Sequence, residues 1–204
     1  MPRYLTDKDI ADFRAELCKV ATERFARHGY EGVTMRQLAE ALGCSPKTPY
    51  RYFKDKADIL TTVRAQAFAK FADTLEKAAA SAKDTIARAR QVGGAYMKFA
   101  FANPQAYRIM FEIGQPIDDS HPELSREAMR ARRFITHQAE EMKAAGIIDV
   151  DPAMFGWAMW AAAHCTVMLA QAGMLHDGPD HAKLAGFHGE LMFRGAMAMA
   201  KKGK

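Results

Sequence analysis

Hydrophobic residues recur every three to four positions along most of the chain, which is the spacing of amphipathic α-helices. The pattern predicts an all-α fold of about nine helices. Their expected ranges are 6–27, 34–43, 45–53, 57–80, 83–102, 104–112, 123–145, 153–170 and 180–200.

Between Thr34 and Lys56 the pattern predicts two short helices joined by a tight turn. Thr34 and Gln37 have the spacing of a capping box, which marks the start of a helix. Gly43 can adopt the left-handed backbone that ends a helix. Ser45 offers a hydroxyl cap for a new one. This arrangement is typical of a helix-turn-helix, whose second helix enters the major groove of DNA.

Pro49 disturbs the second of these helices because proline has no N–H to donate within a continuous helix from Ser45. We therefore predict a helix that starts late, with Thr48 as its cap and Pro49 as its first residue. The segment from Ser45 to Thr48 would be extended. The DNA-reading surface would then combine this segment with Tyr50 and the residues after it.

The candidate DNA contacts are basic or hydroxyl-bearing residues of this region. Lys and Arg neutralise phosphates or read guanine edges, while Thr and Tyr hydroxyls fix the register on the backbone. Among them we single out Lys47 and Tyr52, whereas Tyr50 could be partly core and Arg51 only a solvated charge. The full set is Thr34, Arg36, Ser45, Lys47, Thr48, Tyr50, Arg51 and Tyr52.

The run YRYFKDKADIL after ALGCSPKTP resembles the signature of the TetR family of transcriptional regulators, over residues 6–62. The resemblance implies an N-terminal three-helix domain that binds operator DNA as a homodimer. It also implies a larger C-terminal helical domain for ligand binding and dimerisation. By the same resemblance, Lys56 contacts phosphate. Pro49 stands where the family usually has Leu, Val or Ile.

Two further segments are similar to the WHG type of C-terminal domain found in part of that family. They are FANPQAYRIMF (101–111) and MWAAAHC, and the resemblance spans residues 81–175. Trp160 and His164 are four residues apart, which places them on one helical face. Cys165 replaces the glycine of the motif.

The predicted domains are residues 1–62, which bind DNA, and 63–204, which bind the ligand and form the dimer. The helix at 57–80 links them without a Pro/Gly-rich linker. In the C-terminal domain, aromatic and Met side chains could together line an apolar pocket for a small effector, as the family resemblance implies, although for any single one of them ordinary core is the favoured interpretation. His164 could contact the ligand or be a satisfied core histidine. The candidate pocket residues are Tyr96, Met97, Phe101, Tyr107, Met110, Phe134, His137, Trp157, Trp160, His164 and Met168.

Residues 153–170 are apolar on all sides and reach the length of a membrane span. We favour a buried helix because the run is alanine-rich and is flanked by acidic residues. One face would line the domain core and the other a partner subunit. This helix and the last one would then form a four-helix dimer interface. Its candidate residues are Phe155, Leu169, Leu184, Phe187 and Leu191.

Composition adds little to this prediction: 49% apolar and 26% charged residues are typical of a globular protein. A net charge of +5 is compatible with a polyanionic partner. Cys18, Cys44 and Cys165 suggest neither a disulfide framework nor a zinc site. No signal peptide is evident, so we expect a cytoplasmic protein without membrane partners.

No catalytic motif, nucleotide-binding glycine pattern or metal-ligand spacing emerges from the sequence. The spacing of His176, His181 and His188 does not place the three side chains on one helical face. We therefore expect no cofactor, no metal and no enzymatic activity. The favoured function is a homodimeric repressor that a small, largely apolar effector releases from a palindromic operator. The alternative is a non-specific or architectural DNA-binding protein without an effector. An enzyme on a helical scaffold is a third possibility.

Overall fold

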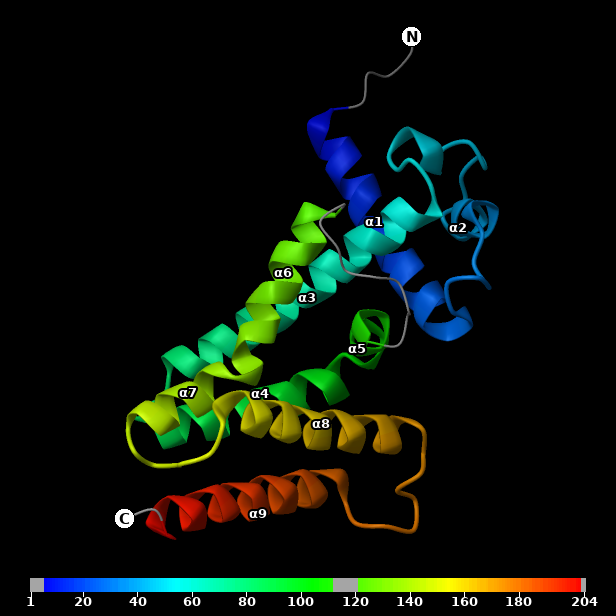
Figure 1. Cartoon of the computed structure of the whole chain (residues 1–204). Coiled ribbons are helices and arrows are strands. Elements are labelled where there is room, and N and C mark those ends of the chain that lie inside the picture. Colours follow the sequence, from blue (N-terminus) through cyan, green and yellow to red (C-terminus); the bar gives the residue numbers. More distant parts are fainter. Residues whose placement is uncertain (1–5, 112–120, 203–204) are drawn as a thin grey trace. The chain divides into compact units, whose positions relative to one another are not determined.

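The computed structural model describes residues 6–111 and 121–202, with side chains to residue 199. Over these residues the chain forms helices and no strand, so the all-α prediction is confirmed (Figure 1). The α-helices are α1 (Asp7–His28), α2 (Met35–Ala41), α3 (Lys56–Ala80), α4 (Thr85–Ala102), α5 (Pro104–Phe111), α6 (Pro122–Arg132), α7 (His137–Ala144), α8 (Pro152–Gln171) and α9 (His181–Lys202). Two short 3-10 helices are η1 (Pro49–Arg51) and η2 (Arg133–Ile135).

Contacts divide the chain into two compact units. Unit 1 comprises the described residues of Met1–Ala69 and Gln105–Ala128, and unit 2 those of Lys70–Pro104 and Met129–Lys204. This division differs from the predicted single boundary after residue 62, which stays a prediction. α5 joins the N-terminal helices because Ile109 is fully buried in their core.

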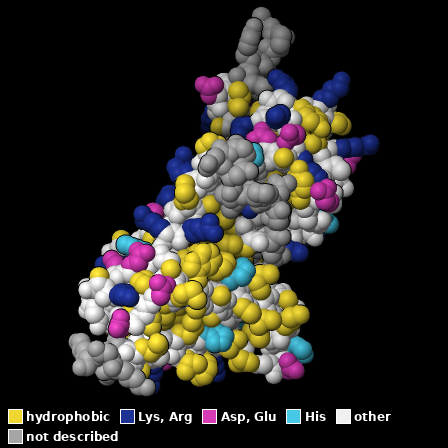
Figure 2. Space-filling model, in the orientation of Figure 1, with side chains coloured by type: hydrophobic (Ala, Val, Ile, Leu, Met, Phe, Trp, Pro, Cys, Tyr) yellow, Lys and Arg dark blue, Asp and Glu magenta, His cyan; other side chains and the backbone are white. Residues whose placement is uncertain are grey.

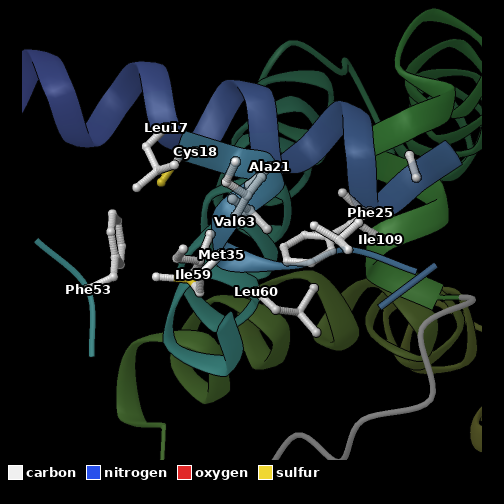
Figure 3. Close-up of a cluster of buried hydrophobic side chains, with 13 residues drawn as sticks. Leu17, Cys18, Ala21, Phe25, Met35, Phe53, Ile59, Leu60, Val63 and Ile109 are labelled. Carbon is white, nitrogen blue, oxygen red and sulfur yellow. The ribbon is translucent and has the colours of Figure 1, made fainter. Parts of the chain in front are cut away.

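The core of unit 1 holds its helices around one cluster of apolar side chains (Figure 3). Leu17 and Phe25 of α1, Ile59 and Leu60 of α3 and Ile109 of α5 are at most 1% exposed. Full burial of a side chain of this size stabilises the folded state by about 1.5–3 kcal/mol. The cluster gives the short α2 and η1 a rigid support that they could not supply themselves.

In unit 2, α4, α7, α8 and α9 pack around a smaller cluster that includes Met142, Ile148 and Ala196. α8 and α9 run side by side (Figure 1). Polar contacts join α4 to α7 and to α8. Arg88 of α4 pairs with Glu141 of α7 at 2.6 Å, and the Gln171 side chain of α8 donates to the Ala100 carbonyl of α4 at 3.2 Å.

The single helix predicted over residues 123–145 is wrong, because η2 separates α6 from α7. α8 passes very close to this break. The Ile135 carbonyl lies so close to Gly156 of α8 that a Cβ on Gly156 would be 2.0 Å from it. Glycine at this position therefore lets α8 approach the backbone of the interrupted helix, which the local pattern of residues 123–145 does not reveal.

Gly93 and Gly94 of α4 do not mark such an approach. Both glycines weaken the helix relative to alanine. In the part of the chain that the structure describes, a Cβ on either glycine would meet no atom within 4 Å. Close helix contact within the chain is therefore not the reason for these glycines.

α8 is less buried than its composition suggests. Among the described residues it is the one helix whose length and composition would suit a membrane span, which by itself is weak evidence. Only 22% of its 18-residue apolar window is buried within the chain. One side of α8 packs in unit 2, and the other side is exposed in the single chain.

Candidate nucleic-acid interface

α2 and the segment after it form the predicted turn between helices. The Thr34 hydroxyl accepts a hydrogen bond from the Gln37 N–H at 3.2 Å, and the Gln37 side chain accepts one from the Thr34 N–H at 2.8 Å. Gly43 follows with a φ of +63°, a backbone conformation that residues with a Cβ adopt only with strain. The capping box and the left-handed glycine are both confirmed.

The second helix of the pair is reduced to η1, so a helix over 45–53 is not formed. Pro49 is the first residue of η1 and its ring is buried. Thr48 precedes it as predicted, but its backbone is helical and its side chain makes no capping bond. Residues 45–48 form a turn and are not extended as predicted. The Ser45 carbonyl accepts a hydrogen bond from the Thr48 N–H at 2.8 Å, because Pro49 has no N–H that could make the α-helical bond to this carbonyl.

The exposed side chains of this segment carry basic and hydroxyl groups. Lys47, Tyr50 and Arg51 are exposed, and Tyr50 keeps 57% of its surface accessible. Tyr50 is therefore not a core residue. Neither Lys47 nor Arg51 forms an ion pair with any residue that the structure describes. Ser45 is also exposed and Thr48 half-buried. This set can offer two cations and a phenol to a polyanion.

Thr34, the N-cap of α2, and Arg36, in the first turn of α2, are both exposed. The Thr34 hydroxyl is already used in the cap. Arg36 forms a salt bridge of 2.8 Å with Glu40, one helical turn on. Such an exposed pair is worth less than about 1 kcal/mol, so a phosphate can replace Glu40.

Tyr52 and Lys56 face the protein more than the solvent. The Tyr52 ring stacks on Phe13 with centroids 4.3 Å apart. The Lys56 amine donates to the Tyr30 carbonyl at 2.8 Å, lies 4.0 Å from the Tyr30 ring centre, and is 3.8 Å from Glu31. The Lys56 amine has three N–H donors, so those not used by the Tyr30 carbonyl could still contact a phosphate. The phosphate contact of Lys56 stays a prediction.

Two basic residues near this surface were not singled out from the sequence. Lys54 is exposed two residues before α3, and its backbone N–H donates to the Asp58 carboxylate at 2.9 Å. Arg14 of α1 is half-buried and contacts both Tyr52 and Phe53. Lys54 could have been found from its place between η1 and α3. Arg14 could not, because its partners lie 38 or more residues away in the sequence.

Two family models match the chain, and both describe TetR proteins. Residues 17–63 match the model of "Bacterial regulatory proteins, tetR family". Residues 89–188 match the "Tetracyclin repressor-like, C-terminal domain". The chain belongs to the TetR family. The two matches fall on the helix-turn-helix region and on the later helices, as the resemblance implied.

Curated relatives of this TetR-family chain are named as transcriptional regulators. It is 28% identical over 127 residues to the HTH-type transcriptional regulator Rv1816 of Mycobacterium tuberculosis. The aligned region covers 59% of this chain and 52% of that protein. It is 36% identical over 71 residues to the HTH-type transcriptional repressor AcnR of Corynebacterium efficiens, covering 35% of this chain and 37% of that protein. The chain thus spans about half the length of the first of these relatives.

Solved structures share the fold over nearly the whole chain. A bacterial regulatory protein of the tetR family from Rhodococcus RHA1 superposes with a TM-score of 0.76 at 19% identity, covering 90% of this chain and 96% of that one. At this identity the likeness shows the fold alone. The WHG subtype of the C-terminal region stays a prediction.

The predicted ligand-pocket residues are distributed over both units. Tyr107 and Met110 are buried in unit 1. In unit 2 the Trp160 and His164 rings stack with centroids 5.0 Å apart, which confirms that they share one face of α8. The remaining residues of unit 2 range from the buried Tyr96, through the half-buried Met97, Phe101, Phe134 and Met168, to the exposed His137 and Trp157. Their role as a pocket stays a prediction.

A cavity of about 470 Å³ lies elsewhere in unit 2, between the end of α8 and the start of α9. His181 at its edge packs on Phe101, with ring centroids 3.9 Å apart. Among the described residues, no group of three or more His, Cys, Asp or Glu could hold a metal ion. The lining residues are Ala170, Gly173, Leu175, His176, Gly178, Pro179, Asp180 and His181.

α8 and α9 carry most of the large hydrophobic side chains that remain exposed. Figure 2 shows hydrophobic side chains gathered over these two helices. Phe187 is 64% and Leu191 59% exposed, both on α9, while Leu169 and Leu184 are half-buried. Phe155 packs against the cluster of unit 2. Other exposed members are Met154, Trp157 and Met199.

Proposed function

We propose that this chain is a homodimeric repressor that binds an inverted-repeat operator in double-stranded DNA. A small, largely apolar effector releases it. The observation that supports DNA binding best is the segment around η1, which presents Lys47, Tyr50 and Arg51 to solvent beside a rigid core. Two such segments about 34 Å apart would meet successive major grooves on one face of the duplex.

The test is selection of bound duplexes from a random pool, followed by competition with unselected duplex of the same length. A regulator prefers its site by at least about a thousandfold at physiological salt. The selected site should be an inverted repeat, because a two-fold dimer reads both halves alike. A preference below about tenfold would instead support an architectural, non-specific DNA-binding protein.

The dimer is supported by the exposed apolar side chains of α8 and α9. A contiguous patch of this kind on a single chain is typical of a protein interface. We expect Leu191→Glu to give a monomer in solution, because the charge would be buried against a partner without compensation. Met129→Glu is the matched control, since Met129 is equally exposed at 61% but lies on α6. Mass measurement by sedimentation separates the two, and a dimeric Leu191→Glu protein would contradict the interface.

Thiol labelling provides a second view of the same interface. Cys165 is exposed in the single chain and lies on α8. Because the proposed dimer covers α8, Cys165 should react more slowly in the wild-type dimer than in the Leu191→Glu monomer. Equal reaction rates in the two proteins would place Cys165 outside the interface.

Effector binding is supported by the aromatic side chains of unit 2, among them the Trp157–Trp160 pair with centroids 5.4 Å apart. The chain has two tryptophans, and both are on α8. A ligand that binds beside them changes the intrinsic fluorescence directly. Apolar compounds that change this fluorescence should also weaken operator binding, because an effector shifts the population away from the DNA-bound state. Operator affinity unchanged by every compound that binds would contradict the regulatory mechanism.

A further inference from the structure

The segment from Ser45 to Tyr52 has few backbone hydrogen bonds to hold its shape. Pro46 and Pro49 lack an N–H, and η1 is only three residues long. Backbone N–H groups of Thr48, Arg51, Tyr52 and Phe53 donate to the carbonyls of Ser45, Thr48, Pro49 and Pro49, respectively. A 3-10 helix this short does not maintain itself in water. Something outside the segment must fix the direction in which Lys47, Tyr50 and Arg51 point.

Two neighbouring residues of α1 make that contact. A guanidinium N–H of Arg14 donates to the carbonyl of Tyr52, and the guanidinium carbon lies 4.0 Å from the centre of the Phe53 ring. The Phe13 ring stacks on the Tyr52 ring at 4.3 Å, with 28° between the planes. α1 thus holds the last residue of the turn through its backbone and its side chain together.

The Tyr52 carbonyl is a chemically suitable attachment point. Tyr52 follows the last residue of η1, and the carbonyls at the end of a helix lack partners within it. The Tyr52 carbonyl belongs to the peptide unit that follows η1, so the bond from Arg14 holds the chain directly after Tyr50 and Arg51.

We infer that Arg14 and Phe13 of α1 are positioning residues of the DNA-reading surface, which fix the orientation of η1 together with the buried Pro49 and Phe53. Arg14 acts through Tyr52 and Phe53 and not by contact with DNA. Its guanidinium is half-buried and engaged on two protein groups. The inference rests on the proposed function, since it assigns the residues that shape that same surface.

The experiment compares wild type with Arg14→Gln, Arg14→Lys and Arg27→Gln. Arg27 is exposed on the same helix, so its variant removes the same charge without touching η1. Each protein is titrated with the selected duplex and with random duplex at several salt concentrations. Active protein is counted by stoichiometric titration, so that loss of folded protein is not mistaken for loss of preference.

We expect Arg14→Gln to reduce the ratio of specific to non-specific affinity about tenfold, the effect of roughly one mismatched base pair. The salt slope should stay unchanged, because no phosphate contact is lost. Arg14→Lys should recover most of the ratio, since lysine can still donate to the Tyr52 carbonyl above the Phe53 ring. Arg27→Gln should retain the wild-type ratio.

Two results would overturn the inference. An unchanged ratio with fewer active molecules would make Arg14 a merely structural residue, and a slope reduced by about 1 would make it a direct phosphate contact. If Arg14→Gln does not fold, Phe13→Leu replaces it with the same expected loss of preference. A wild-type protein without sequence preference would refute the proposed function itself, and that outcome is visible before any variant is made.

Discussion

Replacing Gly156 by alanine should destabilise the protein severely for one added methyl group. The new Cβ would lie 2.0 Å from the Ile135 carbonyl oxygen and 3.0 Å from the Thr136 Cα. Both neighbours are backbone atoms, so no side chain can rotate away and η2 or α8 must shift by more than an ångström. Overpacking of this kind costs about 1–3 kcal/mol, and the rigid neighbours favour the upper end of that range. For a chain of this size, each kcal/mol lowers the midpoint of thermal unfolding by about 2–4 °C.

The matched control is the same substitution at Gly93 in α4, where a Cβ would meet no described atom within 4 Å. Gly93→Ala should stabilise the protein by about 1 kcal/mol through helix propensity alone. Both variants are measured by chemical and thermal unfolding at one fixed protein concentration, because dimer stability depends on concentration. A Gly156→Ala protein as stable as wild type would refute the close approach of α8 to η2. A destabilised Gly93→Ala protein would show that another molecule covers this face of α4.

Three smaller changes test the DNA-binding unit. Lys47→Ala should weaken operator binding and lower the salt slope by about 1, and a slope equal to that of wild type would remove Lys47 from the phosphate contacts. Thr34→Ala should cost about 1 kcal/mol of unfolding free energy, with Thr34→Ser close to wild type, as measured by urea unfolding. Burial raises the pKa of the Cys18 thiol from 9.0 to about 11. The folded state therefore holds this proton between those values while the unfolded state releases it, so stability falls as pH rises from 9 to 11. Cys18→Ala should show less of that loss, and equal pH profiles of the two proteins would contradict the raised pKa.

The local sequence was sufficient where structure depends on near neighbours. Thr34 and Gln37 form a capping box because both partners lie within one helical turn. The late start of η1 at Pro49 follows from a missing N–H, which is a property of one residue. The spacing of Trp160 and His164 placed both rings on one face of α8, where they stack. The helical pattern likewise predicted nearly every helix, because each buries a stripe of its own.

Only the tertiary structure decided features that join distant segments. The close approach of α8 to η2 depends on Gly156, which follows η2 by more than twenty residues. The inward direction of Lys56 depends on Tyr30, and the anchoring of Tyr52 depends on Arg14. The sequence by itself determined that this chain is helical and carries a helix-turn-helix signature, because periodicity and caps are local. How η1 is held, and which side chains it therefore presents, was decided by packing between residues that no sequence spacing brings together.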